Sequence, residues 1–209
     1  MASLSRGTYI VLGIIVVCAI IELALNLADW GLIEPNRLRF IAYEYGGFWR
    51  GLLNDWNSNY RFQPYMMFLS YGFLHSGIAH LIINMMTLWS LGQAVVRRVG
   101  GVGFTVIYSM SLLGGAVFFA LLAPDLRMVG ASGALFGLAG AILSWMYVDR
   151  FNFNQGLLPV AQAVVLLVLL NLILFWAMEG QLAWQTHLGG FIAGWVAALL
   201  VDPRPVEAD

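Results

Sequence analysis

The chain has 209 residues, of which 61% are hydrophobic and only 10% are charged. Since a soluble domain carries about 25% charged and about 45–50% apolar residues, this composition excludes an ordinary soluble protein and predicts one that lies in lipid. The formal net charge of -1 argues against a nucleic-acid partner, because such partners are normally bound by a basic patch or stripe.

Six apolar stretches are each long enough to cross a bilayer as a helix, which takes about 20 residues. We expect these helices at residues 8–28, 78–95, 102–123, 130–148, 157–178 and 182–201. The first stretch is too long for a cleaved signal peptide and lacks an A-x-A-like site, so we expect it to remain as an anchor. The sequence therefore predicts an all-α, polytopic membrane protein whose six-helix bundle forms one domain over residues 1–209.

Residues 29–77 form the only long connection between the predicted helices. They contain Trp30, Trp49 and Trp56 with several Tyr and Phe residues, and amphipathic aromatic side chains prefer the membrane–water interface. Connections longer than about 12–15 residues tend to be functional or disordered, and the aromatic content argues against disorder. We therefore expect a compact first loop that is partly embedded in the headgroup layer of the membrane.

The arginines of the short loops indicate how the chain is inserted, because cytoplasmic loops carry an excess of basic residues. With the N-terminus inside, the inner face holds Arg6, Arg97, Arg98, Arg150 and Arg204. The short outer loops then hold only Arg127, although the four arginines of the long connection weaken the bias. We expect both termini to lie on the inner side.

Polar residues that could carry chemistry lie near the start of the second, fourth and sixth predicted helices. His80 and Asn84 belong to the first turns of the second helix. Ser132 lies in the first turn of the fourth, and His187 lies about one turn into the sixth. Alternate helices run in the same direction, so all four side chains are predicted to lie at similar depth below one membrane surface. Polar groups inside hydrocarbon are costly and tend to mark function.

Ser132 and His187 are the candidate nucleophile and base of a serine hydrolase. A serine between small residues of a membrane helix is by itself more often a packing residue, and a buried histidine can be purely structural. However, a helix N-terminus supplies free N–H groups and positive partial charge, which would stabilise an oxyanion beside Ser132. An imidazole, which ordinarily titrates near about pH 6.5, is a suitable base for a serine hydroxyl.

Glycines allow these two helices to approach each other closely. Gly133 and Gly137 lie four residues apart on the fourth predicted helix, and Gly190 and Gly194 repeat this spacing on the sixth. Small residues at this spacing let helix backbones come together in membranes. We therefore expect the serine to lie within hydrogen-bond reach of the histidine.

His80 and Asn84 are four residues apart, so their side chains share one helical face and can donate hydrogen bonds to one point. The alternative is that the pair only joins neighbouring helices. A zinc site is a third interpretation, since the chain has a third histidine, His75, in the preceding loop, and three histidines could bind zinc. Against it, the carboxylate nearest to any of them in sequence is Glu179, and zinc catalysis usually uses a neighbouring Glu as base.

Glu22 is the only acidic residue deep in a predicted membrane helix. A channel or transporter would need more intramembrane charge, and the chain has no clear inverted repeat of the kind found in transporters. We therefore expect Glu22 to make a structural hydrogen bond to a neighbouring helix.

Taken together, the three motifs resemble those of the rhomboid intramembrane serine proteases. The family pattern is His-x4-His-x3-Asn in the second membrane helix, Gly-x-Ser-Gly in the fourth, and His with a following Gly-x-x-x-Gly in the sixth. The matching residues in this chain are His75, His80, Asn84, Gly130, Ser132, Gly133, His187, Gly190 and Gly194. The resemblance covers roughly residues 8–201.

The resemblance implies a serine endopeptidase that uses no metal or other cofactor and cleaves transmembrane or membrane-adjacent segments of other membrane proteins. Ser132 would attack the peptide carbonyl and His187 would take its proton. The backbone N–H of Ser132 and the side chains of His80 and Asn84 would hold the oxyanion. Phe136 stands where the family often has a Tyr packed on the catalytic histidine, and it would support the ring by stacking.

The resemblance also implies a location in a bacterial inner membrane, with the active site open to the outer face. A Trp-Arg pair common in the first loop of the family is replaced by Met66-Met67, and Val96 replaces an acidic residue at the inner end of the second helix. The alternative is an inactive rhomboid-like protein that binds membrane proteins, but such a protein is expected to have lost the serine or the histidine, and this chain retains both. The sequence does not indicate an oligomeric state.

Overall fold

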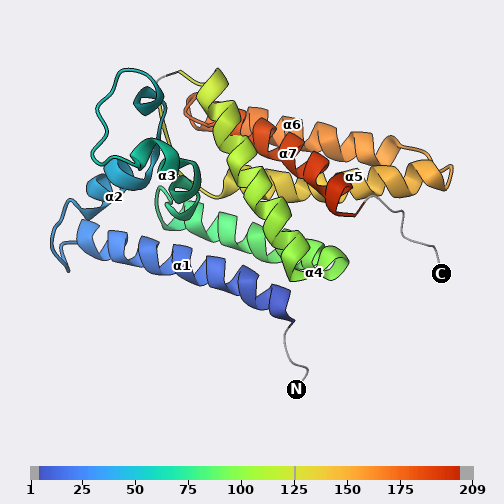
Figure 1. The fold of residues 1–209 in the computed structure, drawn as a ribbon, viewed down its shortest axis with the longest axis horizontal. Coiled ribbons are helices and arrows are strands. Elements are labelled where there is room, and N and C mark those ends of the chain that lie inside the picture. The colour runs from blue at the N-terminus through green and yellow to red at the C-terminus, as the bar shows by residue number, and fades with distance from the viewer. Residues whose placement is uncertain (1–4, 125, 203–209) are drawn as a thin grey trace.

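The computed structural model describes residues 5–124 and 126–202. Within these residues, five helices are long and apolar enough to cross a membrane. They are α1 (Arg6–Asp29), α4 (Ile78–Leu122), α5 (Ser132–Asn152), α6 (Leu158–Ala177) and α7 (Trp184–Val201). Figure 1 shows these helices packed as a bundle, with the shorter elements gathered at one end. The chain is therefore an all-α polytopic membrane protein, as its composition predicted. Arg204, which entered the orientation prediction, lies outside the described residues.

The helix α4 contains two of the predicted membrane helices, residues 78–95 and 102–123. As one straight helix its 45 residues would be about 68 Å long, more than twice the ~30 Å thickness of the hydrocarbon core. The helix is broken at Gly100, whose φ of 71° is a left-handed conformation that glycine adopts without steric cost. The chain changes direction there (Figure 1), so α4 supplies two of the six predicted crossings.

The long connection between α1 and α4 is folded, as its aromatic content predicted. It contains α2 (Leu38–Gly46), β1 (Phe48–Trp49), the 3-10 helix η1 (Arg50–Leu53), α3 (Gln63–Ser70) and the 3-10 helix η2 (Tyr71–Phe73). The strand β1 pairs with the antiparallel β2 (Arg127–Met128), so that Phe48 lies opposite Met128. This pairing ties the connection to the segment that leads into α5.

A buried ion pair attaches the connection to α1. The carboxylate of Glu22, which is 1% exposed, accepts hydrogen bonds from the two Nη atoms of Arg39 in α2 at 2.9 and 3.1 Å. It also accepts one from Asn26 at 2.7 Å. The expected hydrogen bond of Glu22 to a neighbouring helix is therefore confirmed, because Arg39 lies in α2, a helix of the long connection, whereas Asn26 lies on α1 itself. The planar guanidinium stabilises the buried carboxylate because it presents two donors at once.

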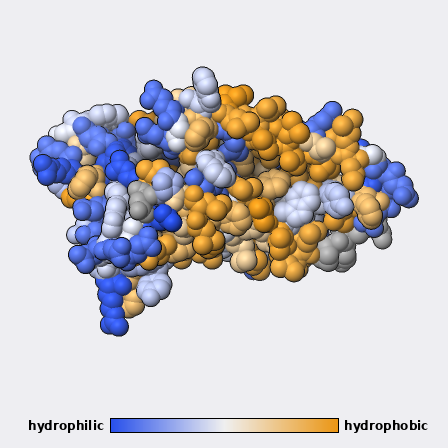
Figure 2. All heavy atoms as spheres, turned by 90° about the horizontal axis from the view of Figure 1, so that it is seen from above, coloured by the Kyte–Doolittle hydropathy of each residue, from blue (hydrophilic) through white to orange (hydrophobic). Residues whose placement is uncertain are grey.

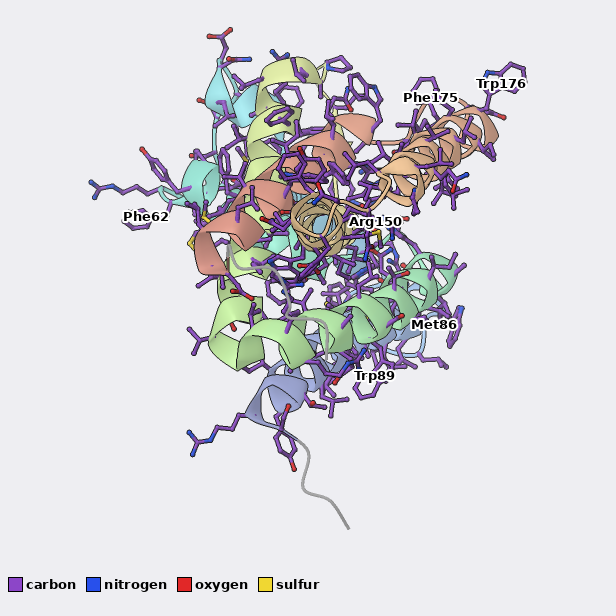
Figure 3. The ribbon with its side chains drawn as sticks, turned by 90° about the vertical axis from the view of Figure 1, so that its right-hand side faces the viewer. Phe62, Met86, Trp89, Arg150, Phe175 and Trp176 are labelled. Carbon is purple, nitrogen blue, oxygen red and sulfur yellow. The ribbon has the colours of Figure 1, made fainter. Side chains whose placement is uncertain are left out.

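The helices α4, α5 and α7 form the centre of the bundle, whereas α6 stands at its edge. The contacts of α7 with α5 and with α4 are the most extensive between elements. In α6, by contrast, only Val160 is buried, and Figure 3 shows this helix apart from the rest with Trp176 pointing outward. Apolar side chains form a band across the middle of the molecule between hydrophilic ends (Figure 2). Such a band is the surface that a bilayer-spanning protein requires.

Candidate active site

Three helices begin at the end of the bundle that carries the loop elements. The first residues of α4, α5 and α7 all lie toward this end (Figure 1), as the alternation of helix directions predicted. His80 lies in the first turn of α4, Ser132 is the residue at which α5 begins, and His187 lies at the end of the first turn of α7. The structure therefore gathers these three side chains at similar depth.

The segment before α5 is hydrogen-bonded to η2, and η2 is in turn hydrogen-bonded to α4. The Gly130 N–H donates to the carbonyl of Tyr71 at 2.9 Å, and the Tyr71 hydroxyl donates to the carbonyl of Leu112 at 2.8 Å. Gly130 has a φ of 125°, which residues with a side chain rarely adopt. The helix begins directly after this turn at Ser132, so the N–H of Ser132 is a first-turn donor without an intrahelical acceptor.

Ser132 and His187 are joined by a hydrogen bond between their side chains. The Ser132 Oγ lies 2.8 Å from His187 Nε2, and His187 is 4% exposed. Glycines make this proximity possible, since a Cβ added at Gly190 would overlap the carbonyl of Gly133 in α5. A Cβ added at Gly194 would overlap the backbone of α5 one turn further along. The two helices thus meet backbone to backbone beside the hydrogen bond.

The imidazole of His187 is held on its face and at its second nitrogen. The Phe136 ring is stacked on it with centroids 4.2 Å apart and an angle of 8° between the planes. The Nδ1 atom lies 2.6 Å from the Oδ1 atom of Asn171 in α6. The histidine therefore contacts residues of two helices besides its own: Ser132 and Phe136 from α5, and Asn171 from α6.

The ring of His80 presents an N–H group to the segment that leads into Ser132. Its Nδ1 accepts a hydrogen bond from the backbone N–H of Ser76 at 3.3 Å and lies 2.9 Å from the Ser76 hydroxyl. Because a backbone N–H can only donate, the neutral ring carries its proton on Nε2. A Cβ added at Gly130 would lie 3.0 Å from this Nε2 atom, so glycine leaves room for the donor beside the serine.

Asn84 is 4% exposed and lies one turn below His80 on α4. Its Nδ2 atom donates to the carbonyl of His80 at 2.8 Å. An amide nitrogen carries two hydrogens, so one of them is not used by this bond. Within residues 5–124 and 126–202, no hydrogen bond joins Ser132 to either His80 or Asn84.

His75 lies in the loop before α4 and is fully buried. Its ring is packed edge-on against that of His80, with centroids 5.2 Å apart. Its carbonyl accepts hydrogen bonds from the Tyr43 hydroxyl at 2.6 Å and from Arg39 Nη1 at 3.1 Å. Burial lowers the pKa of His75 to about 4, and the neighbouring His80 acts in the same direction. In the part of the chain that the structure describes, no three potential ligands are grouped to hold a metal ion.

A largely apolar cavity of about 390 Å³ lies between α5, α6 and α7. His187 and Asn171 form part of its wall, together with aromatic side chains of all three helices, Phe136, Phe175 and Trp184 among them. The cavity lies on the side of His187 where its Nδ1 atom meets α6.

Comparison with known proteins identifies the family. The family model described as Rhomboid domain matches residues 62–204, which is more than half of the chain and includes all three motifs. The chain belongs to the rhomboid family. The bundle around Ser132 and His187 is therefore a rhomboid membrane domain.

Several curated rhomboids are similar to this chain over the same region. RHOMBOID-like protein 4 of Arabidopsis thaliana is 34% identical over 137 residues, which cover 66% of this chain and 34% of that protein. Rhomboid protease GluP of Bacillus subtilis (strain 168) is 36% identical over 125 residues, covering 60% and 24%. Rhomboid-like protease 3 of Toxoplasma gondii is 30% identical over 135 residues, covering 65% and 51%. The matched region thus spans 24% to 51% of the length of these relatives.

Asn171, which contacts His187 in this rhomboid site, is not among the site residues that the sequence predicted. The signal was present, since Asn171 is the one polar residue in the apolar run 163–178, and polar groups within membrane helices usually face a partner. What the sequence does not contain is the direction of this side chain. The run is apolar on every face, so it has no polar stripe that would orient the helix.

Proposed function

We propose that this chain is an intramembrane serine endopeptidase that cleaves transmembrane or membrane-adjacent segments of other membrane proteins. The observation that carries the proposal is the 2.8 Å hydrogen bond between Ser132 Oγ and His187 Nε2, because it joins a nucleophile to a base inside the membrane bundle. Membership of a family with a relative named as a protease supports the same class of reaction.

Ser132 attacks the scissile carbonyl carbon while His187 Nε2 accepts the hydroxyl proton. His187 then gives this proton to the leaving amine, and a water molecule activated by the same nitrogen hydrolyses the acyl-enzyme. Stacking on Phe136 at 4.2 Å restricts the imidazole to the plane in which its Nε2 faces the serine. No metal or other cofactor enters this reaction.

Three donors serve the oxyanion that forms on attack. The N–H of Ser132 lies at the start of α5, where the helix dipole favours negative charge. The Nε2–H of His80 and the unused N–H of Asn84 are the two side-chain donors. Donors that are already in place cost no reorganisation when the charge develops, and the bond from Ser76 to His80 Nδ1 supports this role because it leaves the proton on Nε2.

Substrate and water reach the site by different routes in this proposal. Water enters from the end of the bundle that carries the loop elements, and a transmembrane substrate enters sideways from the bilayer past α6, the least buried of the membrane helices. We place both termini on the inner side and the active site toward the outer face because of the arginine distribution. The bacterial inner membrane is proposed from the family resemblance alone. Residues 1–209 act as one membrane domain.

The alternative is a catalytically inactive rhomboid-like module that binds membrane proteins, and the name of the Arabidopsis relative is compatible with it. Retention of both Ser132 and His187 favours the enzyme. A fluorophosphonate probe, which reacts with activated serines, decides between them when the purified protein is labelled in liposomes and the modified peptide is mapped. We expect the label on Ser132, its loss in Ser132→Ala, and its retention in Ser144→Ala, a buried serine of the same helix. A folded protein without label would favour the binding module.

A further inference from the structure

The second ring nitrogen of His187 has a partner on another membrane helix. The Nδ1 atom lies 2.6 Å from Asn171 Oδ1, a short hydrogen bond, while Nε2 lies 2.8 Å from Ser132 Oγ. Ser132, His187 and Asn171 therefore form a continuous chain of side-chain hydrogen bonds from α5 through α7 to α6. The proposed mechanism uses only Ser132 and His187.

The orientation of the Asn171 amide follows from its second hydrogen bond. Its Nδ2 atom donates to the carbonyl of Leu167 at 3.1 Å, and a carbonyl can only accept. The other end of the amide, Oδ1, is an acceptor, so the Nδ1 atom of His187 must donate. The proton of the neutral imidazole is thereby fixed on Nδ1, and Nε2 is left with the lone pair that can accept the proton of Ser132.

The surroundings offer His187 no substitute for this acceptor. Apart from His187 and Asn171, the residues that line the cavity between α5, α6 and α7 are apolar or aromatic, so Asn171 carries the only side-chain acceptor there besides the His187 ring itself. A protonated ring nitrogen without a partner there would be a buried unsatisfied donor, which is energetically unfavourable. Without Asn171, the tautomer with the proton on Nε2 would become more populated. In that tautomer the His187 ring has no lone pair facing the serine.

We propose that Asn171 is a positioning residue that completes a Ser132–His187–Asn171 triad by fixing the tautomer and orientation of His187. The inference rests on the proposed protease function. Asn171 acts on His187 alone, and the Nδ1–H···Oδ1 bond persists when the ring becomes an imidazolium. An asparagine has this position in the Cys-His-Asn arrangement of papain-like proteases. In a membrane helix, an amide supplies the acceptor without the cost of burying an ionised carboxylate.

The first test reads the tautomer directly and does not depend on activity. The protein is labelled with nitrogen-15 histidine and its imidazole nitrogens are observed by NMR, with His187 assigned through the signals lost in His187→Gln. We expect a proton on Nδ1 in the wild type and in Asn171→Asp, and a shift of the proton toward Nε2 in Asn171→Leu. Gln162→Leu removes the other amide of α6, which is exposed, and is the control that should match the wild type. A wild-type proton on Nε2, or a tautomer unchanged in Asn171→Leu, overturns the proposal.

The second test reads catalysis on a model transmembrane substrate. Asn171→Leu is expected to lower kcat on the order of 10- to 100-fold, by analogy with the loss of the partner that orients a metal-ligating histidine, with KM changed by less than about threefold. Asn171→Asp should recover most of this loss, and Gln162→Leu should behave as the wild type. A change confined to KM, or equal losses in Asn171→Leu and Gln162→Leu, would show that α6 contributes only packing.

Failure of the proposed protease function can be distinguished from failure of the proposed triad. If the fluorophosphonate probe does not label Ser132 in the wild type, the proposed function fails, while the NMR measurement still decides whether Asn171 sets the tautomer. If Ser132 is labelled and Asn171→Leu keeps both the wild-type tautomer and the wild-type kcat, the protease stands and the triad is wrong.

Discussion

The backbone of Gly190 in α7 lies so close to that of Gly133 in α5 that a single methyl group at Gly190 would overlap the Gly133 carbonyl oxygen. His187 lies three residues before Gly190, and Ser132 lies one residue before Gly133. Their side chains share the 2.8 Å hydrogen bond. The distance between the candidate base and nucleophile is thus set by contact between two glycines.

Gly190→Ala is therefore expected to push α7 away from α5. Overpacking of a close contact costs about 1–3 kcal/mol, and the colliding atom here is backbone that cannot rotate away. We expect a lower midpoint of thermal unfolding in detergent and a loss of cleavage. Gly13→Ala, in α1 where an added Cβ meets nothing within 4 Å, is the matched control and should be neutral or slightly stabilising. A Gly190→Ala protein as stable and active as the wild type would show that the close contact is not needed.

Ser132→Ala and His187→Ala should each abolish cleavage of a model transmembrane substrate while leaving the protein folded. Residues that act as a unit give strongly non-additive losses, so the double variant is expected to be little worse than either single one. The cleavage rates of the wild type, the two single variants and the double variant, measured in liposomes, form a double-mutant cycle. Additive losses would mean that the two residues contribute independently and do not form a dyad.

Asn84→Ala tests the oxyanion role against simple helix contact. A donor that acts only in the transition state affects kcat more than KM, and loss of such a donor costs on the order of 10²–10³ in a soluble serine protease. Since the Ser132 N–H remains, we expect a loss at or below this range and a stability change no larger than about 0.6–2 kcal/mol.

Asn84→Asp is the matched variant for this prediction. A carboxylate of nearly the same shape, if ionised, would repel the oxyanion, so its kcat should be lower than that of Asn84→Ala. Near-normal kcat in Asn84→Asp, or simple unfolding of Asn84→Ala, would favour the structural role.

Arg39→Leu is expected to destabilise the protein through Glu22. The change leaves the Glu22 carboxylate, 1% exposed, without its two guanidinium donors, and it removes one donor from the His75 carbonyl. Loss of one partner of a fully buried pair costs about 3–5 kcal/mol, and we expect about 2–4 because the Arg39 side chain is 20% exposed. Chemical unfolding in micelles measures the effect.

Two controls accompany the Arg39 prediction. Arg37→Leu removes an exposed arginine next to the start of α2 and should be neutral. Glu22→Leu combined with Arg39→Leu should regain much of the lost stability, because no unpaired buried charge remains; the Asp29 carboxylate, which also loses its Arg39 partner, is 36% exposed. If the double variant is as unstable as Arg39→Leu, the buried carboxylate is not the cause.

Burial of His75 is expected to make the stability of the folded protein sensitive to acid. Its pKa is lowered to about 4 in the folded chain, whereas an unfolded histidine titrates near about 6.5. Between these values the unfolded state binds a proton that the folded state does not, so stability falls as the pH decreases from about 6.5 to about 4. His75→Phe removes this term and should flatten the dependence of the unfolding midpoint on pH over that window. An equal slope in both proteins would contradict a buried neutral His75.

The number, order and direction of the membrane crossings were determined by the sequence alone. A span needs about 20 apolar residues because the bilayer cannot satisfy exposed backbone groups, and this requirement is local. The common depth of His80, Ser132 and His187 follows from the same counting, because alternate helices run in one direction. The glycine spacing likewise indicated that α5 and α7 approach closely.

The partners of individual polar side chains were decided only by the tertiary structure. Asn171 belongs to a run that is apolar on all sides, and a helix without a polar face carries no signal of its rotation. Glu22 pairs with Arg39 because folding of the long connection brings α2 onto α1, and β1 reaches β2 across a long sequence separation. Such contacts depend on the rotation of helices and on the course of a loop, and both are set by packing among distant segments.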